Sequence, residues 1–277
     1  MKIKFWGVRG SIPTSGADTN KYGGNTSCLT LTGADYNLVL DGGSGMQNVS
    51  FADPMIDNRI DILLTHYHLD HLQGLGFFKS LFNPNLEIHI WGPAADYDEL
   101  HFRLNRYLSP PLFPVLLRDL PCKLHLHAIN NSHFSIGALD IHARYVIHPG
   151  PTVGYRIKEG NKVFTYIPDH EPALGPEGML KSSNWISGFD LADQADLLYH
   201  DGQYTAHEYL TRIGWGHSSM ADAVLFARAS QAKHLILAHH DPGHTDEQLD
   251  EIYAQLMDDH LCEFVCELAR EGITIEL

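Results

Sequence analysis

The pattern of apolar and polar positions predicts a chain that is rich in strands, with most of its helices in the second half. Apolar runs and alternation indicate strands at residues 3–6, 28–32, 36–40, 59–65, 86–91, 123–129, 139–146, 152–158, 162–167, 195–200, 234–238 and 273–277. Helical periodicity occurs at residues 73–81, 94–108, 218–230 and 246–270, and Gly272 follows the last of these as a stop signal. Two stacked sheets with helices outside would bury all of these faces.

A proline-rich stretch interrupts this pattern without dividing the chain. Residues 105–121 contain four prolines and read as a loop that runs over the surface. Strands resume on both sides of it with similar composition. Residues 1–277 are therefore expected to form one domain.

Composition narrows the classes of function. Asp plus Glu number 34 and Lys plus Arg 19, which leaves a formal net charge of −15. Such a chain is a poor match for duplex DNA, bulk RNA or an anionic membrane surface, because affinity for phosphates comes mainly from Lys and Arg. No apolar run approaches the roughly 18 residues of a membrane span. The apolar run at the first residues is too short for a signal peptide. Four cysteines make no disulfide framework, so a cytoplasmic protein is expected.

Histidine is the unusual component, with 19 residues, and one segment concentrates it. The sequence THYHLDH at residues 65–71 comes directly after a buried strand. Residues at i and i+2 of an extended segment point the same way, so His66 and His68 can reach one metal ion. Asp70 and His71 stand where the chain turns, and can reach a second ion. Imidazole with carboxylate suits Zn²⁺, Mn²⁺ or iron, and the ligand mixture alone does not choose among them.

This motif and its surroundings resemble the metallo-β-lactamase superfamily, in its phosphodiesterase branch with RNase Z-like enzymes. The resemblance extends over most of the chain. It rests on LVLDGG at 38–43, HPGPTVGYR at 148–156, YIPD at 166–169, LYHD at 198–201, GHSS at 216–219 and LILAH at 235–239. The opening GVRGSIP at 7–13, with YGGNTSC at 22–28, resembles a bacterial group of that branch. The fold implied is an α/β, four-layer αβ/βα sandwich.

The resemblance also implies a ligand set for two divalent metal ions, with zinc favoured and Mn or Fe as alternatives. One ion would be held by His66, His68 and His148. The other would be held by Asp70, His71 and His239, and Asp169 would bridge the two.

Three residues receive catalytic roles in this comparison. Asp70 would orient or deprotonate the water that bridges the metals. His217 would act as general acid toward the leaving alkoxide, because imidazole changes its charge near neutral pH. Asp201, at the position of a family Glu, would orient His217.

Other candidate ligands are set aside. DPGHT at 241–245 reads like the third-ligand segment of lactamases, but a long helix follows His244, so His148 is preferred and Thr245 is expected to cap that helix. His125 and His127 alternate on one face of a strand and are expected to be a solvated pair. Cys262 and Cys266 lie one turn apart in the predicted last helix and are expected to be buried there.

These features predict a metal-dependent hydrolase that cleaves a small phosphodiester, such as a cyclic nucleotide. RNase Z enzymes carry a basic arm that grips tRNA, whereas residues 105–121 are apolar and hold only Arg106 and Arg118, which argues against tRNA or long nucleic acid. The alternatives are an RNase Z-like RNA 3′-end endonuclease, a thioesterase or lactonase of the same fold, and a non-catalytic metal-binding domain. A homodimer also stays open.

Overall fold

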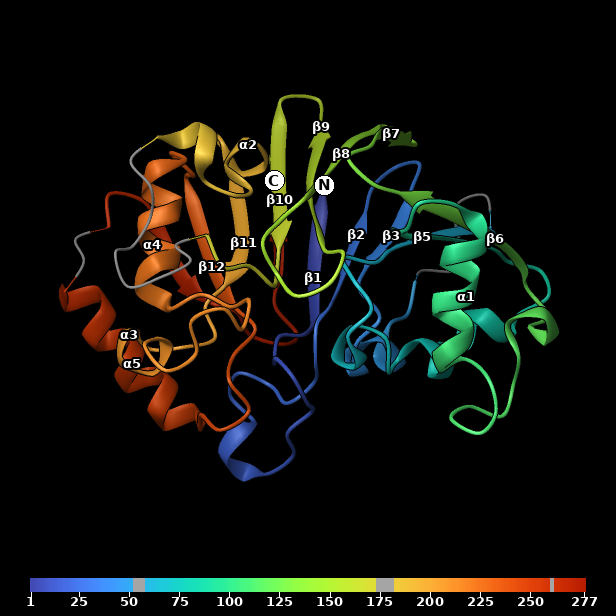
Figure 1. Ribbon diagram of the computed structural model, residues 1–277, viewed down its shortest axis with the longest axis horizontal. Helices are drawn as coiled ribbons and strands as arrows, with labels where there is room; N and C mark the ends of the chain where they lie inside the picture. The colour runs from blue at the N-terminus through green and yellow to red at the C-terminus, as the bar shows by residue number, and fades with distance from the viewer. Residues whose placement is uncertain (52–57, 173–181, 260–261) are drawn as a thin grey trace.

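The computed structural model describes residues 1–51, 58–172, 182–259 and 262–277, and two seven-stranded sheets form its centre (Figure 1). The first sheet runs in the order β14 (Thr274–Glu276), β1 (Lys2–Gly7), β2 (Cys28–Thr32), β3 (Asn37–Leu40), β4 (Arg59–Leu63), β5 (Glu87–Pro93), β6 (Lys123–Ile129). The second runs in the order β13 (Val265–Leu268), β12 (His234–Ala238), β11 (Leu197–Asp201), β10 (Lys162–Ile167), β9 (Val153–Glu159), β8 (Leu139–Tyr145), β7 (His133–Ile136).

Helices cover the outer faces of the two sheets. Figure 1 shows α1 (Tyr97–Tyr107) on the side of the first sheet, and α4 (Met220–Ala229) and α5 (Asp246–Asp259) on the side of the second. Two single-turn helices, α2 (Phe189–Ala192) and α3 (Ala206–Tyr209), lie near α4 and α5. No helix within the described ranges is long and apolar enough to cross a bilayer.

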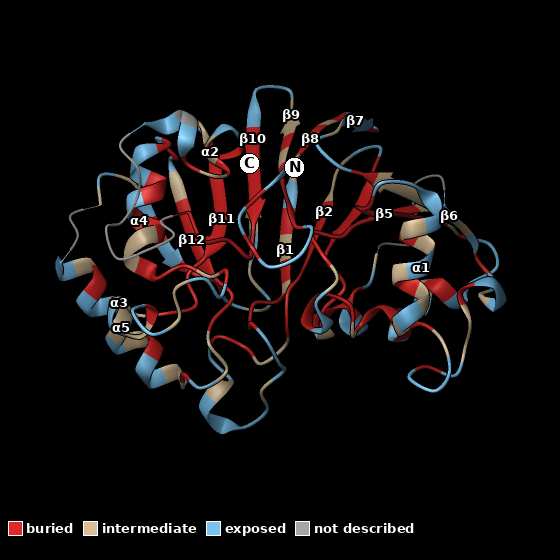
Figure 2. Cartoon of the chain, in the orientation of Figure 1, coloured by how far each residue is buried: buried red, intermediate tan, exposed pale blue. Residues whose placement is uncertain are grey.

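Three apolar clusters bind these layers together. One lies between the sheets and joins residues such as Phe5 and Tyr199, whose rings meet edge to face at 5.4 Å. A second lies under α4 and α5, and a third under α1. Figure 2 shows that the central strands are buried along most of their length, whereas the helices expose their outer faces. The expected four-layer αβ/βα sandwich is confirmed.

The direction of the strands also determines where functional side chains can lie close together. Strands β3, β4, β5 and β6 are parallel neighbours, and so are β10, β11, β12 and β13. Because parallel strands end at the same edge of a sheet, the residues that follow β4, β10 and β12 are brought together there.

The helix predicted at residues 73–81 is wrong. Short 3₁₀ turns occupy this region at Leu69–His71, Leu75–Phe77 and Lys79–Phe82. The amide of Gly74 donates to the carbonyl of Gly42 at 2.8 Å instead of to its own turn. A Cβ on Gly74 would lie 2.0 Å from the carbonyl oxygen of Gly43, so only glycine permits this close approach.

The predicted helix at residues 246–270 is correct only in its first half. It ends at Asp259, residues 260 and 261 lie outside the described residues, and Val265–Leu268 forms strand β13 beside β12. Cys262 and Cys266 therefore do not share a helix face: Cys266 is a buried residue of the strand, and both thiols are free. Strand β7, which pairs with β8, was not predicted; Gly137 turns between them with φ of 52°.

Candidate metal centre

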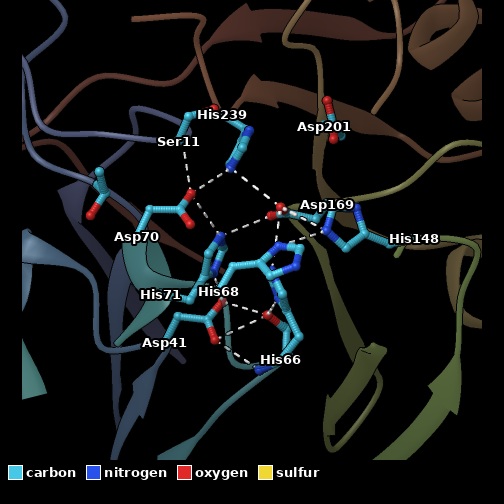
Figure 3. Close-up of polar contacts among 12 residues, drawn as sticks. Ser11, Asp41, His66, His68, Asp70, His71, His148, Asp169, Asp201 and His239 are labelled. Atoms are coloured by element: carbon cyan, nitrogen blue, oxygen red, sulfur yellow. Dashed lines mark hydrogen bonds and ion pairs between the residues drawn. The ribbon is translucent and has the colours of Figure 1, made fainter. Parts of the chain in front are cut away.

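The segment after β4 supplies four of the predicted ligands. His66 and His68 lie in the extended part of this segment, and Asp70 and His71 lie in the 3₁₀ turn that follows. Figure 3 shows their side chains converging with those of residues from the second sheet. The spacing argument for this segment therefore agrees with the observed geometry.

The first group of side chains consists of His66, His68, His148 and Asp169. One ligand atom from each lies within 4.8 Å of all the others. His66 Nε2 and His148 Nε2 are each 3.7 Å from Asp169 Oδ2, and His68 Nδ1 is 3.1 Å from His148 Nε2. His148 Nδ1 is held by the carbonyl oxygen of Gly216 at 2.7 Å, which turns Nε2 toward the group.

The second group consists of Asp70, His71 and His239. His239 Nε2 is 3.2 Å from Asp70 Oδ2, and His71 Nε2 is 3.4 Å from the same oxygen. Asp169 faces this group as well, with Oδ1 3.0 Å from His71 Nε2 and Oδ2 3.4 Å from His239 Nε2. A single buried carboxylate thus stands between the two groups.

Several of these atoms are buried but have no hydrogen-bond partner. Among the described residues they include His66 Nε2, His71 Nε2 and Asp169 Oδ1. Buried polar atoms are normally satisfied, and exceptions need an explanation such as an ion. Three or four nitrogen and oxygen donors on each side of a shared carboxylate suit divalent metal ions. The chain's own residues therefore fit the metals that the sequence predicts.

The pKa shifts of the histidines differ between the two ligand groups. Burial lowers the pKa of His66 well below its usual range and that of His148 to about 4. Burial opposes the charge of His71 and His239 too. The nearby carboxylates, Asp169 and Asp70 among them, together outweigh burial, so the pKa of His71 lies well above its usual range and that of His239 is raised to about 9. Burial would raise the pKa of Asp169, but His239, His71 and His66 hold it well below its usual range. The carboxylates of the centre are thus held as anions that face positive charge.

Asp41, at the end of β3, supports the ligands from behind. Its carboxylate accepts the Thr65 main-chain N–H at 2.7 Å, the Tyr166 hydroxyl at 2.9 Å and the His71 Nδ1–H at 2.9 Å. The bond to His71 fixes the tautomer in which Nε2 is free to bind a metal. The sequence suggested a terminal Asp on this strand, but only the structure shows which ligand it orients.

We expect Asp41→Asn to weaken metal binding by about 10–100-fold, because partners that orient a ligand histidine have effects of that size. Asn has nearly the same shape and tolerates the positive φ of 58° at this position, but its amide cannot accept from all of these donors. Competition with a metal chelator would measure the change, with Asp119→Asn on the surface as control. Unchanged affinity would remove Asp41 from this role.

The loop after β1 reaches the same site, although the sequence assigned it no role. The main-chain N–H of Ser11 donates to Asp70 Oδ2 at 2.8 Å, and Ser11 has a positive φ of 61°. Gly10 packs on the His239 ring so closely that a Cβ would lie 2.3 Å from Nδ1. The glycine and serine of the GVRGSIP motif were the available signal, because both mark an unusual backbone.

His217 and Asp201 lie beside the two groups. His217 Nδ1 is 2.7 Å from Asp201 Oδ2, so the shorter Asp at the position of the family Glu still reaches the histidine. The same Nδ1 is 3.9 Å from Asp169 Oδ2. Asp201 is fully buried and also accepts the main-chain N–H groups of His170, Gln203 and Ser218. His217 also forms a third group of possible metal ligands with Asp169 and His239. Its Nδ1 is engaged by Asp201, which leaves Nε2 as the free nitrogen of the ring.

The three histidines that the sequence set aside, His125, His127 and His244, lie outside the two ligand groups. His244 belongs to neither group: its Nε2 lies 2.9 Å from Glu208 Oε1, and Thr245 exchanges hydrogen bonds with Gln248 in the first turn of α5. His125 and His127 share a face of β6, as predicted, but they have a partner that the sequence did not suggest. His89 lies opposite His125 on β5.

Two cavities adjoin the centre. One, of about 480 Å³, begins at His66 and His68 and extends between α1 and the loop at 149–151; it is lined also by Tyr67, Arg103, Arg106 and Leu112. The other, of about 310 Å³, lies on the side of His217 and is lined also by Ser11, Gln203, Tyr204, Arg212 and Trp215. Three arginines therefore surround the centre of an acidic protein.

Comparison with known proteins gives one family and several relatives. The Beta-lactamase superfamily domain matches residues 36–240. A protein named Ribonuclease Z from Thermosynechococcus vestitus is 26% identical over 282 residues, which is 86% of this chain and 66% of that protein. Another of that name, from Staphylococcus carnosus, is 23% identical over 305 residues, covering 94% and 95% of the two chains.

Solved structures share the fold over the full length. The metallo-beta-lactamase fold protein YhfI from Bacillus subtilis superimposes with a TM-score of 0.71 at 20% identity, covering 100% of this chain and 99% of the other. The short form of human tRNase Z gives 0.68 at 19%, covering 100% and 99%. A diphosphatase from the PhnP family gives 0.68 at 14%, covering 100% and 97%. At these identities the likeness shows the fold alone.

Proposed function

Because the chain belongs to the beta-lactamase superfamily and is a metal-dependent hydrolase, we propose that its substrate is a small phosphodiester of nucleotide-like chemistry. The resemblance expected from the sequence is confirmed at the level of the family. The substrate is a finer question, and the residues around the centre bear on it.

The observation that carries the proposal is the pair formed by the buried Asp201 and the partly exposed His217. Three main-chain N–H groups donate to the Asp201 carboxylate and fix its position, and the carboxylate holds His217 by Nδ1. The free Nε2 is then aimed by a rigid partner and can donate a proton. A phosphodiester needs such a donor because its alkoxide is a poor leaving group.

The chain's own residues divide the remaining tasks. His66, His68 and His148 would hold one divalent ion, Asp70, His71 and His239 the other, and Asp169 both. When bound, two such ions lower the pKa of water, hold the phosphoryl oxygens and neutralise developing charge. Asp70, fixed by Ser11, accepts the proton of the attacking water, and His217 Nε2–H protonates the departing oxygen.

The two cavities suit the two ester substituents of a small substrate. Trp215, 60% exposed beside His217, offers a flat surface on which a base can stack. On the opposite side Arg103 and Arg106 line the cavity together with apolar residues such as Leu112. Arg103 is already engaged by Glu99 and the Pro93 carbonyl, whereas Arg106 has no ion pair within the described residues. Arg106 is thus available to a second anionic group of the substrate.

We expect Arg106→Ala to raise KM about 10-fold for a cyclic dinucleotide, since a charge-assisted hydrogen bond contributes about 1.5–3 kcal/mol. The value of kcat should change little. Arg118→Ala is the matched control, because Arg118 lies outside the cavity in the stretch that follows α1 and is 79% exposed. Equal effects of the two variants would show a general charge effect and no anchoring by Arg106.

RNA 3′ ends are the second candidate substrate, favoured by relatives named Ribonuclease Z. The net charge of −15 and the apolar loop at 105–121 weigh against a long RNA. The test is a screen of the metal-loaded protein against bis(p-nitrophenyl) phosphate, cyclic mono- and dinucleotides, a 3′-extended tRNA, a thioester and a lactone. Faster cleavage of the tRNA, or turnover of only the thioester or lactone, would overturn the proposal.

A further inference from the structure

The histidine content is larger than the centre at the strand ends requires. Five of the 19 histidines belong to the two groups described there, and His217 lies beside them. A separate set lies on β5 and β6, at the edge of the first sheet, and comprises Glu87, His89, His125 and His127. We call it the His89 cluster; neither β5 nor β6 contributes a residue to the strand-end centre.

Sheet register places these four side chains on one face. His89 lies directly opposite His125 and Trp91 opposite His127, and Glu87 precedes His89 by two residues. The imidazole rings of His89 and His125 stack at 4.6 Å with an angle of 16° between them. A sequence pattern of His-x-His on one strand becomes a cluster only because this neighbour is in register.

Two ring nitrogens converge on one carboxylate oxygen. His89 Nε2 is 2.8 Å from Glu87 Oε1, and His125 Nε2 is 3.5 Å from the same atom. One ligand atom from each of Glu87, His89 and His125 lies within 4.8 Å of the other two. Two nitrogens and one carboxylate oxygen are a ligand set for borderline cations such as Zn²⁺ or Cu²⁺.

The fourth member orients the buried ring. His89 Nδ1 is 2.8 Å from His127 Nε2, and the His127 ring stacks on Trp91 at 3.9 Å. Trp91 is fixed in turn by a hydrogen bond to the buried Asp61 at 2.9 Å. When His89 donates its Nδ1–H to His127, its Nε2 lone pair faces Glu87, and a cation between these two acceptors removes their repulsion. Metal-bound histidines are commonly held in this way by a partner at the other nitrogen.

We propose that Glu87, His89 and His125 bind a divalent cation of the zinc class, at a site separate from the hydrolytic centre. Glu87 and His125 are 40% and 47% exposed, so solvent can supply the fourth ligand and the ion can enter from solution. His89, by contrast, is buried and gives the site a fixed anchor.

A second trio on the surface competes for the same interpretation. His133, Asp140 and His142 lie close together on β7 and β8. Two of them are more than 40% exposed, and no buried residue anchors the three. We therefore place the cation at the His89 cluster.

The test uses the full chain, stripped of metal and titrated with Zn²⁺ against a weak chelator. We expect His125→Ala to bind one equivalent less than the wild type while its phosphodiesterase activity stays unchanged. His234→Ala is the matched control, because His234 is also on a strand and pairs with a single glutamate, Glu267, at 2.9 Å. It should bind as many ions as the wild type.

The comparison is between variants, so it does not depend on the number of ions at the hydrolytic centre or on its substrate. The side chain of His125 is nearly half exposed, so its removal should leave the fold intact, and a thermal melt of the metal-free proteins verifies this. Equal Zn²⁺ stoichiometry in the wild type and His125→Ala would overturn the proposal. Loss of the equivalent in His133→Ala, with retention in His125→Ala, would assign it to the other trio.

Discussion

An Asp169→Ala variant is expected to lose bound metal and hydrolytic activity together. Both oxygens of this carboxylate face ligand histidines, with Oδ1 3.0 Å from His71 Nε2 and Oδ2 3.4 Å from His239 Nε2. The same Oδ2 lies 3.7 Å from both His66 and His148. No other carboxylate among the described residues joins both ligand groups within that reach.

The size of the effect follows from the chemistry that the metals supply. Charge stabilisation by bound metal is worth several kcal/mol in the transition state, and about 1.4 kcal/mol corresponds to a factor of ten. Activity should therefore fall by on the order of 10³-fold or more. His66→Ala should likewise lose metal and activity together, because His66 is a ligand in the first group.

Metal content after dialysis and hydrolysis of bis(p-nitrophenyl) phosphate measure the two losses in one preparation. Asp119→Asn, an exposed carboxylate on the loop beyond α1, is the control and should change neither. Metal content near two per chain in Asp169→Ala would count against the bridging role. Full metal with lost activity would make Asp169 a residue of the chemical step instead of a shared ligand.

His217→Ala is expected to slow the chemical step and leave the metals in place. General acid catalysis is typically worth about 10²–10⁴-fold, so kcat should fall by that order on a substrate with an alkoxide leaving group. The loss should shrink for p-nitrophenolate, which departs without a proton. Asp201 engages Nδ1 at 2.7 Å, and this is the reason to expect Nε2 to act as the donor.

Two further variants distinguish a role in the chemical step from a structural role. Asp201→Asn should lower kcat in the same direction as His217→Ala, because it removes the partner that fixes the ring. His244→Ala removes a histidine that pairs with Glu208 outside the centre, and it should not change the dependence on the leaving group. If kcat of His217→Ala falls equally on both substrates, His217 positions the substrate. If the variant loses metal, His217 is a metal ligand.

Local sequence determined the parts of this protein that depend on neighbours along the chain. Strands at 28–32, 123–129, 162–167 and 234–238 were predicted with the bounds that the structure has, because their apolar patterns are short and clear. The close spacing of His66, His68, Asp70 and His71 depends only on an extended segment followed by a turn. Resemblance to a family placed the distant residues His148, Asp169 and His239 in the same centre, which spacing alone could not do.

Tertiary structure decided everything that depends on segments far apart in the chain. The predicted helix at 73–81 gave way to 3₁₀ turns because Gly74 bonds to Gly42 across the fold, and residues 265–268 joined β12 as a strand because the sheet offered them partners. The support of Asp70 by Ser11 and of His71 by Asp41 likewise needs long loops to close. His89 meets His125 only through the parallel register of β5 and β6. Hydrogen bonds and packing between distant segments override local propensity, and no periodicity in the sequence encodes the register in which two strands meet.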